Sequence, residues 1–248
     1  EDGLETLLAL LDVDKEWTPH QEGTSLYIRP FIVATQAVLG VHPSAHYVYC
    51  VILSPSGAYY AGGIDPVKIY VETKYVRAAS QGGMGAYKTG GNYAASLIAQ
   101  EEAERQGYSQ VLWLDAVERK YVEEVGSMNV FFKIDGEIVT PELDGSILPG
   151  ITRKSVIQLL RSWGMNVSER KLSIDELESA AKAGKLEEAW GTGTAAVISP
   201  IGELKCGDTV TVINEGRIGE ISQKLYDTIT DIQWGRIPDP FGWITPCC

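Results

Sequence analysis

Two glycine clusters surround a single lysine in the stretch Gly82–Tyr93, directly ahead of a run of helix-forming residues. Glycine permits positive φ values and lets a ligand come close to the backbone, so the stretch predicts a tight loop in front of a helix. A lysine enclosed in such a loop loses solvation and becomes easier to deprotonate. The sequence therefore predicts a nucleophilic amine at Lys88.

Three interpretations of Lys88 compete on local grounds. A phosphate-binding P-loop requires glycine directly before the lysine, and Tyr87 stands there instead. A solvated surface lysine is the ordinary case, although the flanking glycines and the aromatic neighbours Tyr87 and Tyr93 argue against it. The third interpretation is a lysine that forms a Schiff base with a carbonyl cofactor such as pyridoxal phosphate. Spacing alone does not decide among them.

Strand and helix patterns alternate along the chain, which predicts an α/β protein. The expected strands are 25–29, ended by Pro30; 47–53, an apolar run typical of a strand buried on both faces and bounded by a turn at 54–57; and 67–71, 111–115, 121–125 and 129–134. The expected helices begin near 4, 92, 152, 173 and 218, with glycine stops at 107 and 164 and a capping box at 173–176. Asp135-Gly136 predicts a hairpin turn.

Three short features predict binding groups. Tyr27 and Arg29 are two apart on an expected strand, so both side chains point to one face. The loop 148–152 opens onto a helix, and the unpaired first amides of a helix favour an anion. The small-residue segment 190–196 is interpreted as a second loop that offers hydroxyls and amides to oxyanions, although a plain turn would use the same residues.

The composition bounds the function. The 248 residues suffice for one large domain, and a formal charge of -12 without a basic stripe argues against a nucleic-acid partner. No apolar run approaches the roughly 18 residues that cross a bilayer. Four cysteines without a regular framework fit a reducing cytoplasm, and the three histidines show no zinc-ligand spacing, so no metal site is expected. The chain enters an apolar helix almost at once and without a methionine, which suggests a piece of something longer.

Six separated stretches together resemble one family, the branched-chain amino-acid aminotransferases, which are pyridoxal-phosphate enzymes of fold type IV. The resemblance implies a mixed, barrel-like sheet surrounded by helices, with 23–248 as the cofactor-binding large domain and 1–22 as a remnant helix and linker of a truncated N-terminal region. The matching stretches are Gly23–Pro30, Lys88–Tyr93, Glu124–Asn129, Leu148–Arg153, Gly191–Ala195 and Asp231–Gly235.

The resemblance also implies roles in cofactor binding. Lys88 forms the Schiff base with pyridoxal 5'-phosphate and later carries the substrate's α-proton. Glu124 meets the ring nitrogen, with Glu123 as its local rival, and Tyr93 meets the phenolic oxygen. The remaining cofactor-binding residues are Ser127, the amides of Ile151 and Thr152 at the phosphate, and the Thr194 hydroxyl.

For the substrate, the resemblance implies a pocket formed by Tyr27, Arg29 and Tyr59, with the amides of Thr194 and Ala195 at the carboxylate. The implied reaction moves the amino group of leucine, isoleucine or valine to 2-oxoglutarate, giving glutamate and branched-chain 2-oxo acids. A cytoplasmic homodimer with small-molecule partners, and with no membrane or nucleic-acid partner, is expected.

The chain departs from the family pattern at two places. Ala196 and Ser199 stand where some members carry a redox-active cysteine pair, so no such thiol switch is expected. The family's smaller N-terminal domain, which supplies an arginine to the cofactor phosphate, is expected to be missing. Two alternatives therefore stay open, namely another fold type IV enzyme, such as a D-amino-acid transaminase or an aminodeoxychorismate lyase, and an inactive truncated fragment.

Overall fold

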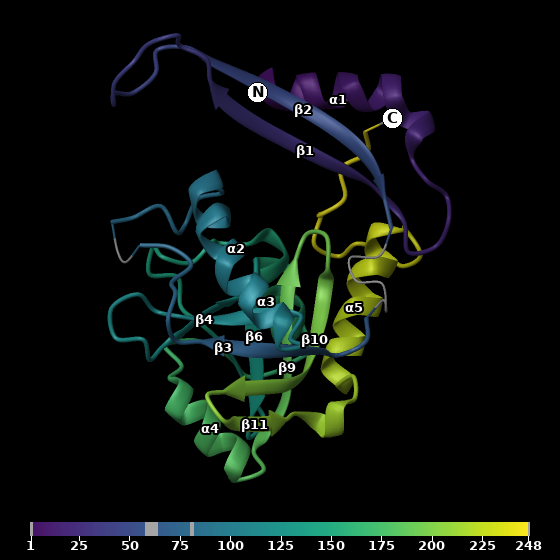
Figure 1. The fold of residues 1–248 in the computed structure, drawn as a ribbon. Helices are drawn as coiled ribbons and strands as arrows, with labels where there is room; N and C mark the ends of the chain where they lie inside the picture. Colours follow the sequence, from purple (N-terminus) through teal and green to yellow (C-terminus); the bar gives the residue numbers. More distant parts are fainter. Residues whose placement is uncertain (1, 58–63, 80–81, 248) are drawn as a thin grey trace. The chain divides into compact units, whose positions relative to one another are not determined.

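The computed structural model of the protein describes residues 2–57, 64–79 and 82–247 (Figure 1). The chain forms two compact units, one made of Glu1–Ala61 with Asp239–Cys248 and the other of Gly62–Pro238. The expected division after residue 22 concerns a longer chain and stays a prediction.

The first unit contains helix α1 (Asp2–Asp14), the short 3-10 helix η1 (Lys15–Trp17) and two long strands, β1 (Ser25–Ala34) and β2 (Tyr47–Ser56). The strands pair antiparallel from end to end, with Ser25 opposite Ser56 and Ala34 opposite Tyr47. The expected opening helix and both expected strands are therefore confirmed as elements.

Two details predicted for these strands are wrong. β1 continues through Pro30, because each strand of a two-stranded sheet has an open edge, where a proline without an amide hydrogen is tolerated. β2 continues through the expected turn at 54–56 and is not buried on both faces, since Tyr47, Tyr49 and Ile52 are exposed. The apolar run predicts a central strand, whereas the strand is paired on one side only.

The second unit is built on six strands that close on themselves. The ring runs β3–β4–β5–β6–β9–β10 and returns to β3. β3 pairs parallel with both β4 and β10, and the other contacts in the ring are antiparallel, so the sheet is mixed as expected. The ring strands are β3 (Val67–Glu72), β4 (Gln110–Leu114), β5 (Val122–Val125), β6 (Met128–Ile134), β9 (Leu186–Gly193) and β10 (Val197–Cys206).

Further strands extend the ring, and helices surround it (Figure 1). β7 continues from β6 through the predicted turn at Asp135-Gly136, β8 pairs with β7, and β11 pairs with β10. These elements are β7 (Glu137–Thr140), β8 (Val167–Glu169), β11 (Thr209–Val212), α2 (Gly90–Arg105), α3 (Ile151–Ser162), α4 (Ile174–Lys182), η2 (Asn214–Gly216) and α5 (Glu220–Gln233).

The core of this unit lies on the ring strands and the helix faces against them. Phe131 of β6 stacks on Trp190 of β9 with ring centroids 5.6 Å apart, and both side chains are fully buried. These residues lie opposite each other in the register of the two strands, so the stacked pair fastens the two chain segments.

The helix boundaries follow the predicted signals closely. α2 ends one residue before Gln106, and Gly107 takes a φ of 84° as the residue that follows a helix end. α4 begins after Ser173, whose side chain accepts the Glu176 amide at 3.1 Å. The predicted starts of α3 and of the C-terminal helix α5 are likewise confirmed within a few residues.

The predicted loop at 190–196 is mostly strand. β9 extends to Gly193, and only residues 194–196 form the turn into β10. The small residues Gly191 and Gly193 are paired to Ser199 and Val197, so ring closure outweighs their local preference for turns. Within the described residues, no helix is both long and apolar enough to traverse a bilayer.

Candidate active site

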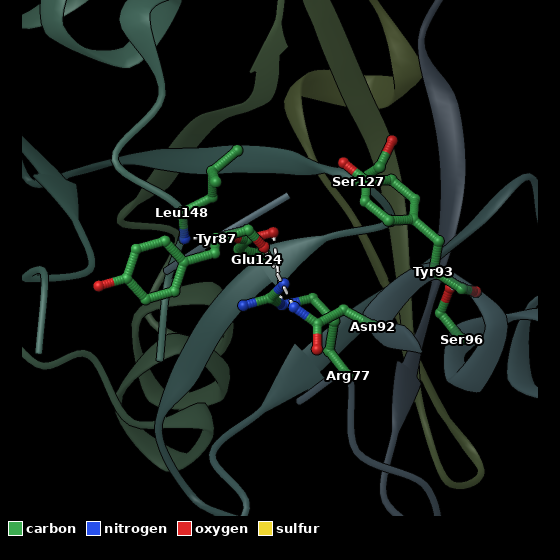
Figure 2. A pocket seen from close by; sticks show the side chains of 9 residues that line it. Arg77, Tyr87, Asn92, Tyr93, Ser96, Glu124, Ser127 and Leu148 are labelled. Atoms are coloured by element: carbon green, nitrogen blue, oxygen red, sulfur yellow. Dashed lines mark hydrogen bonds and ion pairs between the residues drawn. The ribbon is translucent and has the colours of Figure 1, made fainter. Parts of the chain in front are cut away.

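A pocket of about 350 Å³ opens beside the start of α2 and the turn between β5 and β6 (Figure 2). Polar and aromatic groups from three separate chain segments meet there. The lining residues are Arg77, Tyr87, Asn92, Tyr93, Ser96, Glu124, Gly126, Ser127 and Leu148.

The loop that carries Lys88 is fixed by its own hydrogen bonds. The side-chain amide of Asn92, in the first turn of α2, donates to the carbonyls of Met84 at 2.8 Å and Tyr87 at 3.2 Å. The Tyr87 amide also donates to Met84 at 3.1 Å. The glycine-rich segment is therefore an ordered loop folded against a helix start, as the sequence predicts.

Lys88 contacts Tyr93 one helical turn further on. Its Nζ donates to the Tyr93 hydroxyl at 3.0 Å and lies 5.7 Å from the centre of that ring. Tyr93 lines the pocket, whereas Lys88 is exposed. The predicted enclosure of Lys88 is wrong for the described chain, because the glycines give the loop its turns but supply no side chains to cover the amine.

Glu124 is the buried acid of the pocket, with a side chain 4% exposed. One oxygen accepts the Leu148 amide at 2.7 Å, and the other lies 3.4 Å from Arg77 Nε. Burial raises the pKa of Glu124 to about 7, although Arg77, the Leu148 amide and Lys88 each act to lower it. This carboxyl is thus close to the point where it gains or loses a proton at neutral pH.

Glu123, the rival for the acid's role, lies on the other face of β5. Its carboxyl accepts the Ser146 hydroxyl at 2.6 Å and lines a separate cleft of about 960 Å³. Adjacent strand residues point in opposite directions, so the two acids serve different spaces. Of the two, Glu124 faces the pocket that Tyr93 lines.

Arg77 is the pocket residue that the sequence analysis missed. Its Nη2 donates to the Gly85 carbonyl at 3.2 Å and also to the Ser146 carbonyl. A Cβ on Gly85 would lie 2.0 Å from the Ser146 carbonyl oxygen, so only glycine lets these two backbones approach. A lone arginine between a buried strand and the lysine loop was the available signal.

The start of α3 has the open amides expected of an anion site. Gly150 caps the helix without a side-chain bond, and Ile151 is 76% exposed. Asn129 holds the approach, because its amide donates to the Leu148 carbonyl at 2.8 Å and its oxygen would lie 2.2 Å from a Cβ on Gly150. The amides of Ile151 and Thr152 are therefore presented at a fixed helix end.

The remaining candidate residues are placed as follows. Ser127 lines the pocket, but Ile151, Thr152, Thr194 and Ala195 are not among its lining residues. Thr194 and Ala195 are exposed in the β9–β10 turn.

The candidate substrate residues belong to the first unit. Arg29 donates to the Tyr27 hydroxyl at 3.1 Å, and its guanidinium lies 5.0 Å from the centre of that ring, so the predicted shared face is confirmed. Tyr59 falls outside the described residues.

Comparison with known proteins assigns this arrangement. Residues 4–204 match the family model described as amino-transferase class IV. The branched-chain-amino-acid aminotransferase 2 of Bacillus subtilis (strain 168) is 63% identical over 245 residues, which cover 99% of this chain and 67% of that protein.

Solved structures agree with the sequence comparison. The crystal structure of Escherichia coli branched-chain amino acid aminotransferase superposes with a TM-score of 0.81 and 32% identity, over 98% of this chain and 76% of that one. The branched-chain amino acid aminotransferase from T.th., solved with pyridoxamine 5'-phosphate, gives a TM-score of 0.76 and 30% identity, over 90% of this chain and 70% of that one.

The closed mixed ring and the lysine–tyrosine–glutamate pocket thus define a class, and the chain belongs to the class IV aminotransferases, the fold type IV enzymes. Within that class its relatives place it among the branched-chain-amino-acid aminotransferases. The fold and family that the sequence resemblance implies are confirmed.

Proposed function

We propose that this protein transfers the amino group of leucine, isoleucine or valine to 2-oxoglutarate, using pyridoxal 5'-phosphate and giving branched-chain 2-oxo acids and glutamate. The observation that carries the proposal is the contact between Lys88 and Tyr93 beside the pocket that Tyr93 shares with buried Glu124. The substrate class rests on relatives that carry the name branched-chain-amino-acid aminotransferase.

The residues present fit the cofactor. It requires an amine for its aldehyde, an acid for its ring nitrogen and an anion site for its phosphate. Lys88 offers the amine, Glu124 offers a buried acid, and the capless start of α3 offers amides. When bound, pyridoxal phosphate supplies an electron sink for the carbanion formed at the substrate's α-carbon.

Lys88 is proposed as the group that moves the α-proton. A primary amine released from the cofactor remains next to the substrate, so the same Nζ can take that proton and return it. Tyr93 keeps the amine in place, because its hydroxyl accepts a hydrogen bond from Nζ. We also assign Tyr93 to the phenolic oxygen of the cofactor.

Glu124 is proposed as the partner of the ring nitrogen. A carboxylate at that nitrogen favours the protonated ring, which withdraws electrons more strongly. Its two oxygens are held from behind by the Leu148 amide and Arg77, so the carboxyl has a fixed orientation. Burial excludes water from this contact.

The phosphate is assigned to the amides of Ile151 and Thr152, the Thr194 hydroxyl and Ser127. The substrate is assigned to Tyr27, Arg29 and Tyr59, with its carboxylate at the amides of Thr194 and Ala195. These assignments follow the matched stretches of the family. The open helix start and the exposed turn at 194–196 support them.

Two further expectations belong to the same proposal. We infer that the protein acts in the cytoplasm, since its cysteines form no regular framework, and that it works as a homodimer, as the family resemblance implies.

Lysine trapping tests the proposal. The chain is incubated with pyridoxal phosphate, reduced with borohydride and analysed by peptide mass spectrometry, with absorbance at roughly 410 nm followed in parallel. We expect the adduct on Lys88, its loss in Lys88→Ala, and its retention in Lys74→Ala. Retained reducible cofactor in Lys88→Ala would contradict the assignment.

Amino-acid specificity is tested on the same preparation. L-leucine should bleach the absorbance of the loaded chain, and 2-oxoglutarate should restore it. Bleaching by D-alanine but not by L-leucine would favour the D-amino-acid alternative. Bound cofactor that no amino acid bleaches would favour an inactive fragment.

A further inference from the structure

One buried guanidinium contacts three segments that build the pocket. Arg77 is 7% exposed and lies between β3 and α2. Nη2 donates to the carbonyls of Gly85, three residues before Lys88, and of Ser146, two residues before Leu148. Nε lies 3.4 Å from Glu124 (Figure 2). Arg77 therefore joins the lysine loop, the acid and the segment in front of α3.

Arg77 is also the strongest charge acting on Glu124. The charged groups around this carboxyl are Arg77 and Lys88 from the β3–α2 connection and Glu123 from its own strand. Burial raises the pKa of Glu124, Arg77 opposes this more than the Leu148 amide or Lys88 does, and Glu123 adds to the rise. Without the guanidinium, the buried carboxyl would hold its proton more tightly.

The carbonyl that receives Arg77 is itself held rigidly. The Ser146 hydroxyl lies 2.6 Å from a Glu123 oxygen and 2.7 Å from an Asp144 oxygen, and the Ser146 amide donates to Asp144 at 2.9 Å. A hydroxyl has one proton and cannot donate to two carboxylates, so one carboxyl carries a proton of its own. Burial raises the pKa of Glu123, which identifies Glu123 as that acid.

A protonated Glu123 has two effects on the pocket side of β5. It anchors Ser146, whose carbonyl fixes Arg77, and it removes a negative charge next to Glu124. Both effects leave the positive charge of Arg77 directed at Glu124.

We propose that Arg77 is a positioning residue, which keeps the Glu124 carboxylate ionised and oriented while it ties the Lys88 loop to the segment in front of α3. The role is distinct from that of a phosphate ligand, because its donors are occupied by two protein carbonyls and a carboxylate.

The consequence for catalysis rests on the proposed function. Glu124 and the ring nitrogen would share one proton, and a nearby positive charge makes the carboxylate the weaker base of the two. The proton then stays on the nitrogen. Loss of Arg77 would move it toward Glu124 and weaken the electron sink.

The first test needs no cofactor. The Glu124 carboxyl is titrated by ¹³C NMR in chain labelled at glutamate carboxyls, with its signal assigned by Glu124→Gln. We expect Arg77→Gln to raise the pKa of Glu124 by about one unit or more. Arg77→Lys should raise it less, because an ammonium keeps the charge but cannot serve two carbonyls and the carboxylate at once.

Arg170→Gln is the matched control, since Arg170 pairs with Glu137 and Glu176 rather than with any pocket residue. It should leave the Glu124 titration unchanged. An unchanged Glu124 titration in either Arg77 variant that folds would overturn the proposal.

The second test uses cofactor labelled with ¹⁵N at the ring. The nitrogen shift should move toward the unprotonated value in Arg77→Gln, and α-proton transfer should slow by about tenfold for each unit of pKa displaced. An unmoved nitrogen shift in a variant whose Glu124 titration has moved would overturn the catalytic part. If no form binds the cofactor, the proposed function fails, while the cofactor-free titration still decides the role of Arg77.

Discussion

Glu123 and Glu124 are neighbours on β5, yet their carboxyl groups lie on opposite faces of the sheet and line different spaces. Glu124 is bound by the Leu148 amide and Arg77, whereas Glu123 is bound by the Ser146 hydroxyl. Because a strand alternates its side chains, a shift of one residue in register would exchange the two acids. Their roles therefore depend on the register of this short strand.

The pair predicts unequal effects of removing each charge. Glu124→Gln should retain bound cofactor but slow the half-reaction with leucine by about a hundredfold or more, because the ring nitrogen loses its acid partner. Glu123→Gln should change that rate by less than about threefold, since it keeps an acceptor for Ser146. Stopped-flow absorbance measures both. Equal losses would show that the acids act together.

Folding stability should fall as pH rises through the range where Glu124 ionises. Its pKa is raised from 4.5 to about 7 by burial, so the folded chain binds this proton more tightly than the unfolded chain. The stability contributed is fully present below pH 4.5 and is lost as pH approaches about 7, by roughly 1.4 kcal/mol for each pH unit between the unfolded and folded pKa values. Urea unfolding of the cofactor-free chain between pH 5 and pH 8 measures the slope. The slope should become shallower in Glu124→Gln, and an identical slope there would contradict the assignment.

Gly85→Ala should destabilise the second unit. A Cβ would lie 2.0 Å from the Ser146 carbonyl oxygen, so two backbone segments must separate at a cost of about 1–3 kcal/mol. The Arg77 bonds to both carbonyls would lengthen at the same time. Gly90→Ala is the control, because nothing lies within 4 Å of its Cβ. Chemical unfolding compares them, and equal stability of the two variants would rule out the close approach.

Glu188→Ala should loosen the C-terminal helix. The buried Glu188 carboxylate accepts the amides of Ile221 and Ser222 and the Ser222 hydroxyl, each at 3.1 Å, and so satisfies the first turn of α5. Its loss leaves buried donors unpaired and should cost about 1–3 kcal/mol. Hydrogen exchange of the α5 amides measures the effect locally.

The control for this prediction is Glu187→Ala. That neighbouring side chain pairs with Lys133 at a partly exposed site and should cost less than about 1 kcal/mol. Exchange rates in α5 that rise equally in both variants would contradict a capping role for Glu188.

Much of the fold follows from local patterns, as three elements illustrate. Ser173 and Glu176 have the spacing of a helix start, and Gly107 and Gly164 stand just past helix ends with positive φ. These signals are local because a cap or a stop is made by residues within one turn. The strands of the ring were likewise visible as short apolar runs.

What the sequence could not supply depends on contacts between distant residues. The continuation of β1 past Pro30 depends on which edge is paired, and the exposure of Lys88 depends on which side chains cover it. Arg77 contacts Ser146, 69 residues away, and nothing in its immediate neighbours announces that contact. Pairing with distant segments, rather than propensity, decided each of these features.

The ring is completed only when β10 pairs with β3, which brings Ile201 opposite Val67. A chain that has been synthesised as far as β9 leaves the outer edge of β3 unpaired, and closure must bring together segments far apart in sequence. Such long-range pairing makes folding slow and exposes an open strand edge to other chains until the last ring strand emerges from the ribosome.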